Sequence, residues 1–165
     1  MRANYMRYGA RMSSATERTR SFWAWGFEEH FPDADERQIL SQSAAALLQV
    51  PPPPPLPLPR WEDVRLPPPR LSPPVELAAI ADTTDRSRAL HCYGKSFPDQ
   101  LRAFALHFAN PPDFVLYPRD EEDIARCLRL CAAAGVAVVP FGGGTSVVAG
   151  VECPLPSGFG PFVFS

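Results

Sequence analysis

The order of apolar and polar positions divides the chain into regions of different character. Residues 22–50 and 75–110 carry apolar side chains at spacings of three to four, which predicts helices. Between them, the run PPPPPLPLP excludes helix and sheet interior, because proline lacks the amide hydrogen and fixes φ. We therefore expect a disordered N-terminus at 1–21, a helical segment at 22–50, a Pro-rich linker at 51–74, a helical lead-in at 75–110 and an α/β unit at 111–165.

The first helical region opens with the aromatic stretch FWAWGFEEHF, whose rings indicate packing. Asp33 or Asp35 is placed to cap the helix that follows. Its expected apolar positions are Ile39, Ala44, Leu47 and Leu48. The linker PPPPPLPLP predicts a stiff polyproline II spacer, and a ligand for SH3-like domains is the alternative. In the lead-in, one helical face is expected to hold Leu101, Phe104, Ala105 and Phe108.

A strand, a helix and a second strand follow one another from residue 114. FVLYP predicts the first strand, and Asp120 is placed to cap a helix with acidic residues in its first turn. One face of that helix is expected to carry Ile124, Leu128, Cys131 and Ala132. Gly135 can end the helix in a left-handed conformation, and VAVVP predicts a second buried strand. This is a βαβ unit, whose crossover should be right-handed.

The stretch VVPFGGGTSVVAG places three glycines after the carboxyl end of the second strand, where open α/β sheets commonly bind ligands. Gly142, Gly143 and Gly144 allow positive φ, so that successive amides can form an anion-binding nest, and Thr145 and Ser146 add hydroxyl groups. A phosphate or pyrophosphate fits this pattern. The P-loop motif fails because no lysine follows, and the Rossmann fingerprint fails at Val147. A plain glycine-rich turn is the alternative.

Composition removes several functional classes. The net charge of −2, from 16 basic and 18 acidic residues, gives no basis for nucleic-acid binding. No apolar run is long enough for a transmembrane segment, no secretory signal is present, and a cytoplasmic location is expected. None of the four cysteines forms a CxxC pair. Buried thiols are favoured for Cys127 and Cys131 over a metal or redox site.

Two stretches together carry a family resemblance: HCYGKSFPD, and PDFVLYPRDEEDIARCLRLCAAAGVAVVPFGGGTSVVAGVE. They resemble the FAD-binding PCMH-type domain of the vanillyl-alcohol-oxidase superfamily, and within it the alkyldihydroxyacetonephosphate synthase-like FAD-linked oxidases. The resemblance implies that the loop holds the FAD pyrophosphate and that Gly150 lies near the flavin. The loop residues are Pro140, Phe141, Gly142, Gly143, Gly144, Thr145 and Ser146. It also implies non-covalent FAD, since the loop lacks histidine and cysteine. One departure is Ala149, where the family usually has glycine.

The fold class implied is α/β or α+β: a helical segment and Pro-rich linker, then the first βαβ part of a truncated PCMH-type domain. Residues after Glu152 are expected to depart from the family pattern, and the substrate domain to be missing. The implied activity is that of an FAD-dependent oxidoreductase acting on a hydroxy acid or lipid precursor. The resemblance is also compatible with a dimeric protein. Two alternatives are the synthase reaction of ether-lipid synthesis and a non-catalytic interaction fragment. For His91, Tyr93 and Lys95, an exposed turn is favoured over acid–base work.

Overall fold

Four short strands form one mixed sheet with the order β1-β2-β4-β3. They are β1 (Ala81–Asp82), β2 (Val115–Leu116), β3 (Val136–Pro140) and β4 (Gly160–Phe164). Strand β1 is antiparallel to β2, whereas β2 and β3 each run parallel to β4. This computed structural model describes residues 19–153 and 160–164. The chain is thus a mixture of helices and a few strands, and most of the expected N-terminal tail, residues 1–18, lies outside the described residues.

The predicted strand–helix–strand unit is confirmed, with one addition. Helix α4 (Glu121–Ala133) begins at Asp120, whose carboxylate accepts a hydrogen bond from the Asp123 amide at 2.8 Å. It ends before Gly135, which has a φ of 65°. However, β2 and β3 are not neighbours, because β4 lies between them and pairs with both. Strand β1 was not predicted either, since two residues give no readable alternation.

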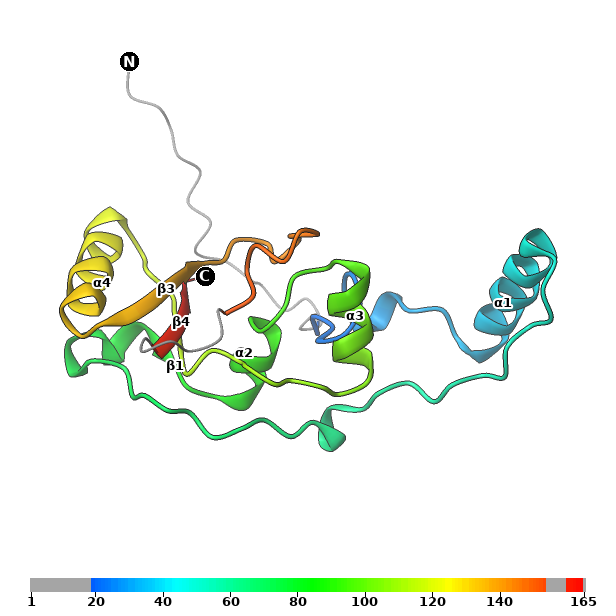
Figure 1. The fold of residues 1–165 in the computed structure, drawn as a ribbon, viewed down its shortest axis with the longest axis horizontal. Coiled ribbons are helices and arrows are strands. Elements are labelled where there is room, and N and C mark those ends of the chain that lie inside the picture. The colour runs from blue at the N-terminus through cyan, green and yellow to red at the C-terminus, as the bar shows by residue number, and fades with distance from the viewer. Residues whose placement is uncertain (1–18, 154–159, 165) are drawn as a thin grey trace, which may run out of the picture.

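Helix α4 packs on the sheet by a different face from the one expected. The buried row is Asp123, Cys127 and Cys131, and the two thiols pack with residues from η3 (Val75–Ile80) and β2. Ile124 and Leu128 are 44% and 48% exposed among the described residues, so the expected face was wrong at both positions. Helix α4 lies beside the sheet (Figure 1). The i, i+4 row with the two small cysteines is buried there, which leaves the bulkier Ile124 and Leu128 exposed.

A second core forms where the aromatic N-terminal segment meets α2 (Asp85–Leu90) and α3 (Phe97–Phe104). The Phe22 ring lies 5.7 Å from that of Trp61, and Tyr93 stacks on Phe108 at 5.8 Å. The packing role expected for the aromatic opening is confirmed. Residues 19–21, expected in the disordered tail, belong to this segment, and Ser21 is fully buried.

Helix α3 also differs from the expected pattern. Leu101 is exposed, and Ala103 is the buried residue of the last turn. The helix ends at Phe104, so the expected helical face does not continue to Phe108.

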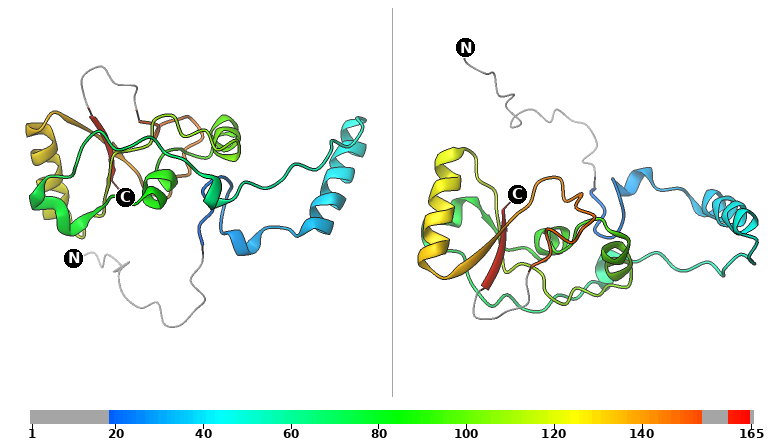
Figure 2. Two further views of the ribbon diagram at one scale, coloured as in Figure 1. Left: turned by 90° about the horizontal axis from the view of Figure 1, so that it is seen from below. Right: turned by 45° about the horizontal axis from the view of Figure 1, so that its top comes forward.

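Helix α1 (Ala34–Leu48) begins at the predicted cap, Asp33, which forms a capping box with Glu36. Its expected apolar positions do not form a core within the described residues, since Ile39, Leu47 and Leu48 are all exposed. Figures 1 and 2 show α1 at one end of the molecule, joined to the remainder by two extended segments. The apolar spacing therefore predicted the helix correctly but not its burial.

Only the first part of the Pro-rich region acts as a spacer. Residues 51–60 contain no helix or strand and are largely exposed. From η2 (Trp61–Asp63) the chain runs back over the second core and continues to η3 (Val75–Ile80). The buried Arg88 guanidinium ties it down by donating to the Pro67 and Pro112 carbonyls at 2.8 Å. The remaining short element is η1 (Glu28–His30).

Candidate functional site

The glycine loop leaves the sheet directly at the end of β3. Phe141 is buried behind it, while Gly142 and Gly143 are exposed. Of the three glycines only Gly144 has a positive φ, 65°, so the expectation of a run of positive φ values was wrong for the other two. The loop makes its turn at a single residue.

The glycines serve different purposes. A side chain at Gly144 would meet the Phe141 ring at 2.5 Å, so the fold itself requires glycine there. At Gly142 a Cβ would meet nothing within 4 Å, and φ is ordinary. Packing within the described residues therefore gives no reason for glycine at 142. Among these residues the amides of Gly142, Gly143 and Gly144 also have no hydrogen-bond acceptor. The bare backbone is open to a ligand.

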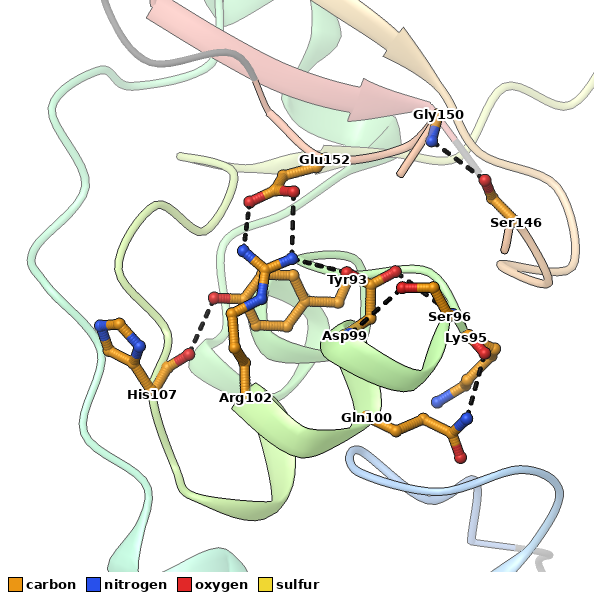
Figure 3. Close-up of polar contacts among 10 residues, drawn as sticks. All are labelled: Tyr93, Lys95, Ser96, Asp99, Gln100, Arg102, His107, Ser146, Gly150 and Glu152. Carbon is orange, nitrogen blue, oxygen red and sulfur yellow. Dashed lines mark hydrogen bonds and ion pairs between the residues drawn. The ribbon is translucent and has the colours of Figure 1, made fainter. Parts of the chain in front are cut away.

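The HCYGKS stretch, far away in sequence, lies directly against the loop. The Lys95 amide donates to the Ser146 carbonyl at 2.6 Å. A side chain at Gly94 would overlap that same carbonyl oxygen, so glycine permits this close approach. On the loop's other side, the Ser146 hydroxyl accepts from the Gly150 amide at 3.0 Å, which draws the loop into a closed turn (Figure 3). The two stretches that carry the family resemblance thus meet in space.

His91 and Tyr93 are not on an exposed turn, so that expectation was wrong. They are 5% and 7% exposed, respectively. The His91 ring lies 4.5 Å from the Phe141 ring, and its Nδ1 lies 2.7 Å from the Ser87 carbonyl oxygen. Burial lowers the His91 pKa, which favours the neutral ring, with Nδ1–H donating to that carbonyl. His91 therefore supports the base of the loop through Phe141.

An arginine clamp holds the end of the loop to α3 (Figure 3). The Arg102 guanidinium donates to both carboxylate oxygens of Glu152, at 2.6 and 3.0 Å, and to the buried Asp99 at 2.6 Å. Its Cζ also lies 4.3 Å from the centre of the Tyr93 ring. The hydrogen bonds to Glu152 are the main cause that raises the Arg102 pKa above its ordinary value. Sequence reasoning missed this clamp, although the S-x-x-D capping box around Asp99 was readable.

A second arginine reaches the loop from the N-terminal segment. The Arg20 guanidinium donates to the Gly143 carbonyl, a contact between residues 123 positions apart. Nothing in the local sequence around Arg20 indicates this contact.

Ala149 has a φ of 57° within the loop. This left-handed conformation favours glycine, so the alanine occupies a strained position. Ala149 and Gly150 are both exposed.

The cysteines show no site chemistry. All four are free and buried, and burial raises the pKa of Cys131 to about 11 and that of Cys153 to about 12. Buried thiols of this kind are poor nucleophiles. Within residues 19–153 and 160–164, His, Cys, Asp and Glu form no group able to hold a metal ion. In the same residues, no helix has the length and apolar character needed to cross a bilayer.

The loop as a whole fits a pyrophosphate. Its amides have no acceptor among the described residues, the space beside Gly142 is open, and the loop lies at the carboxyl end of a parallel strand. Thr145 and Ser146 are at least partly exposed beside these amides, although the Ser146 hydroxyl already accepts one hydrogen bond. The structure thus brings together all the loop residues predicted from the sequence.

Comparison with known proteins agrees with this geometry. Residues 112–159 match the family model described as FAD binding domain. The match corrects the expectation that the family pattern stops at Glu152. The alkyldihydroxyacetonephosphate synthase of Trypanosoma brucei brucei is 36% identical over 95 residues, which are 53% of this chain and 16% of that protein. The mitochondrial D-lactate dehydrogenase (cytochrome) of Kluyveromyces lactis is 47% identical over 36 residues, 22% of this chain and 6% of that protein.

The fold agrees as well. A solved alkyldihydroxyacetonephosphate synthase structure matches with a TM-score of 0.59 at 25% identity, over 66% of this chain and 22% of that one. The chain therefore spans only a small fraction of the relatives that it matches. Residues 112–159 thus match part of an FAD-binding domain, and the chain has distant similarity to alkyldihydroxyacetonephosphate synthase over part of that much larger protein.

Proposed function

We propose that the loop Pro140–Ser146 binds the pyrophosphate of FAD without a covalent bond, that Gly150 lies close to the flavin, and that the chain belongs to a cytoplasmic FAD-dependent oxidoreductase. The observation that carries this proposal is Gly142. It has ordinary φ, open space around its Cα and an amide without an acceptor among the described residues. A glycine that neither packing nor φ requires leaves the backbone open to close contact with a ligand.

Different residues of the loop would make different contacts with the pyrophosphate. The amides of the glycines donate to phosphate oxygens, and hydrogen bonds to a charged acceptor are the stronger kind. The Thr145 hydroxyl offers a further donor at the edge of the loop. Phe141 and His91 hold the base of the loop in place from inside. When bound, FAD supplies an acceptor for hydride. The substrate is proposed to be a small hydroxy acid, in keeping with the D-lactate dehydrogenase named among the relatives.

Valine at position 142 provides the test. The full chain is titrated with FAD, and binding is followed by the quenching of flavin fluorescence. Gly142→Val should weaken FAD binding at least tenfold with little change in the melting temperature, because a Cβ at this position has no protein atom within 4 Å. Ala134→Val introduces the same side chain at an exposed position at the end of α4 and should leave FAD binding intact. Equal FAD affinity for wild type and Gly142→Val would contradict the proposal.

A second candidate is the alkyldihydroxyacetonephosphate synthase reaction, in which a fatty alcohol displaces an acyl chain with no net redox change. The similarity over 53% of the chain to a protein of that name favours it. The two candidates differ in their response to substrate. Flavin bleaching when a 2-hydroxy acid is added without oxygen supports the oxidoreductase. Incorporation of labelled fatty alcohol without bleaching supports the synthase. A chain that remains colourless after FAD loading indicates a non-catalytic piece.

A further inference from the structure

Two cations beside the glycine loop have no carboxylate partner among residues 19–153. The first, Arg20, uses one N–H group for the Gly143 carbonyl and has no ion pair in the described residues. The second, Lys95, is the only lysine of the chain, and its ammonium group has no hydrogen bond within the same residues. The acid that acts on the Lys95 pKa, Asp99, already forms an ion pair with Arg102 at 2.6 Å. The positive charges of Arg20 and Lys95 therefore have no ion-pair partner among the described residues.

Both groups belong to the surroundings of the loop. The Arg20 guanidinium lies against the loop backbone, with its Nη2 3.0 Å from the place where a Cβ on Gly144 would stand. Guanidinium has five N–H donors, so several remain for another acceptor. The Lys95 backbone is bound to Ser146, and its side chain points toward the N-terminal segment that carries Arg20 (Figure 3).

The pKa values of the groups around the loop also support an anion-binding site. Burial and the nearby Arg20 lower the Lys95 pKa to about 8, while Asp99 opposes this change. Arg20 also contributes to the lowered pKa of His91. A positive neighbour and burial both disfavour the charged form of a lysine, and a bound anion would oppose both effects.

We propose that Arg20 and Lys95 form a cationic pair that binds the phosphate oxygens of the dinucleotide together with the amides of the glycine loop. This inference rests on the proposed function, since the anion is the FAD pyrophosphate. It adds to the site the N-terminal segment around Arg20, which lies outside the matched residues 112–159. The aromatic packing of Phe22 and Trp23 then has a functional consequence, because it fixes the segment that presents Arg20.

A dependence on pH follows. The free chain loses the Lys95 charge as the pH rises through about 8, and a bound pyrophosphate would raise the Lys95 pKa and cause proton uptake. The charged groups that act on Lys95 are Arg20 and Asp99. The affinity for FAD should therefore fall above pH 8, by at most about tenfold per pH unit for a single linked proton.

Four variants of the full chain test the pair, with FAD and inorganic pyrophosphate as the two probes. Arg20→Gln and Lys95→Met should each weaken the binding of both probes by about tenfold to a hundredfold. Lys95→Arg should keep the affinity at pH 7 and abolish its fall between pH 7 and 9, because arginine stays charged. Arg129→Gln removes an exposed arginine of α4 that has no ion pair among the described residues, and should change nothing.

The outcomes separate this inference from the proposed function. If wild type binds FAD, and Arg20→Gln and Lys95→Met bind it equally well, the cationic pair is refuted while the proposed function stands. If wild type binds neither FAD nor pyrophosphate, both are refuted. If Arg20→Gln fails to fold, as judged by its melting curve, the pH profile of Lys95→Arg decides. A profile identical to that of wild type overturns the pair.

Discussion

Replacement of Arg102 by methionine removes the guanidinium that joins α3 to the end of the glycine loop. The side chains of Arg102 and Glu152 are partly exposed, at 32% and 33%, whereas Asp99 is only 1% exposed. The two acidic partners should therefore contribute very different amounts. Methionine retains most of the apolar stem, so that the change reports on the charge and the hydrogen bonds rather than on packing.

The cost follows from the burial of each partner. Removing the partner of a buried charge costs about 3–5 kcal/mol, and Asp99 should fall at the lower end because it keeps its contact with the Ser96 amide. The partly exposed pair with Glu152 adds about 0.5–1 kcal/mol. Loss of the cation–π contact with Tyr93 adds a similar amount. We expect the free energy of unfolding to fall by about 4 kcal/mol in total, and the melting temperature by roughly 8–16 °C.

Urea unfolding followed by circular dichroism measures this change. The matched control is Arg60→Met, which breaks the pair of Arg60 with Asp63, where both side chains are exposed. That variant should leave the free energy of unfolding nearly unchanged, because an ion pair between exposed side chains contributes little. A loss below about 1 kcal/mol for Arg102→Met, or equal losses for the two variants, would show that burial of Asp99 does not govern the clamp.

Two further predictions concern the loop and its support. Ala149 has a φ of 57°, so Ala149→Gly should stabilise the chain by about 0.5–1 kcal/mol in urea unfolding. The control Ala134→Gly, at a φ of −87°, should destabilise the chain. A loss of stability in Ala149→Gly would contradict the strain assigned to Ala149. The pKa of His91 is lowered in the folded chain, so the unfolded chain takes up a proton at a higher pH than the folded chain does. The contribution of His91 to the free energy of unfolding is therefore fully present above pH 6.5 and falls as the pH drops below that value. His91→Gln should remove up to about 1.4 kcal/mol per pH unit of this dependence in melts between pH 7 and 5, and an unchanged slope would refute it.

The features that sequence predicted correctly depend on short-range signals. Asp33 and Asp120 each cap a helix through a bond to the amide three residues later. Gly135 ends α4 by its own backbone conformation. The glycine loop belongs to the same class, because its position follows directly from the end of the strand Val136–Pro140. In these cases the partners lie within a few residues of one another, so the sequence contains the whole interaction.

The features that were missed depend on contacts between distant segments. The Arg20 guanidinium finds the Gly143 carbonyl across 123 positions, and the Arg102 clamp joins residues 50 positions apart. Periodicity also cannot tell which of two adjacent helical rows will meet the sheet, and at α4 the row with Cys127 and Cys131 is buried in place of the row with Leu128. Tertiary packing makes that choice after the helix is specified.

Strand β4 shows how a distant segment determines the position of a locally specified loop. Val139 and Pro140, the last residues before the loop, pair with Val163 and Phe164, and the same strand pairs on its other side with β2. Because β2 and β3 do not contact each other in the ladder, β4 alone fixes their separation and register in the described sheet. The local sequence thus determines that a glycine loop follows β3. The pairing with residues 160–164 holds the strand end from which that loop leaves the sheet, and the contacts with Lys95 and His91 hold the loop itself.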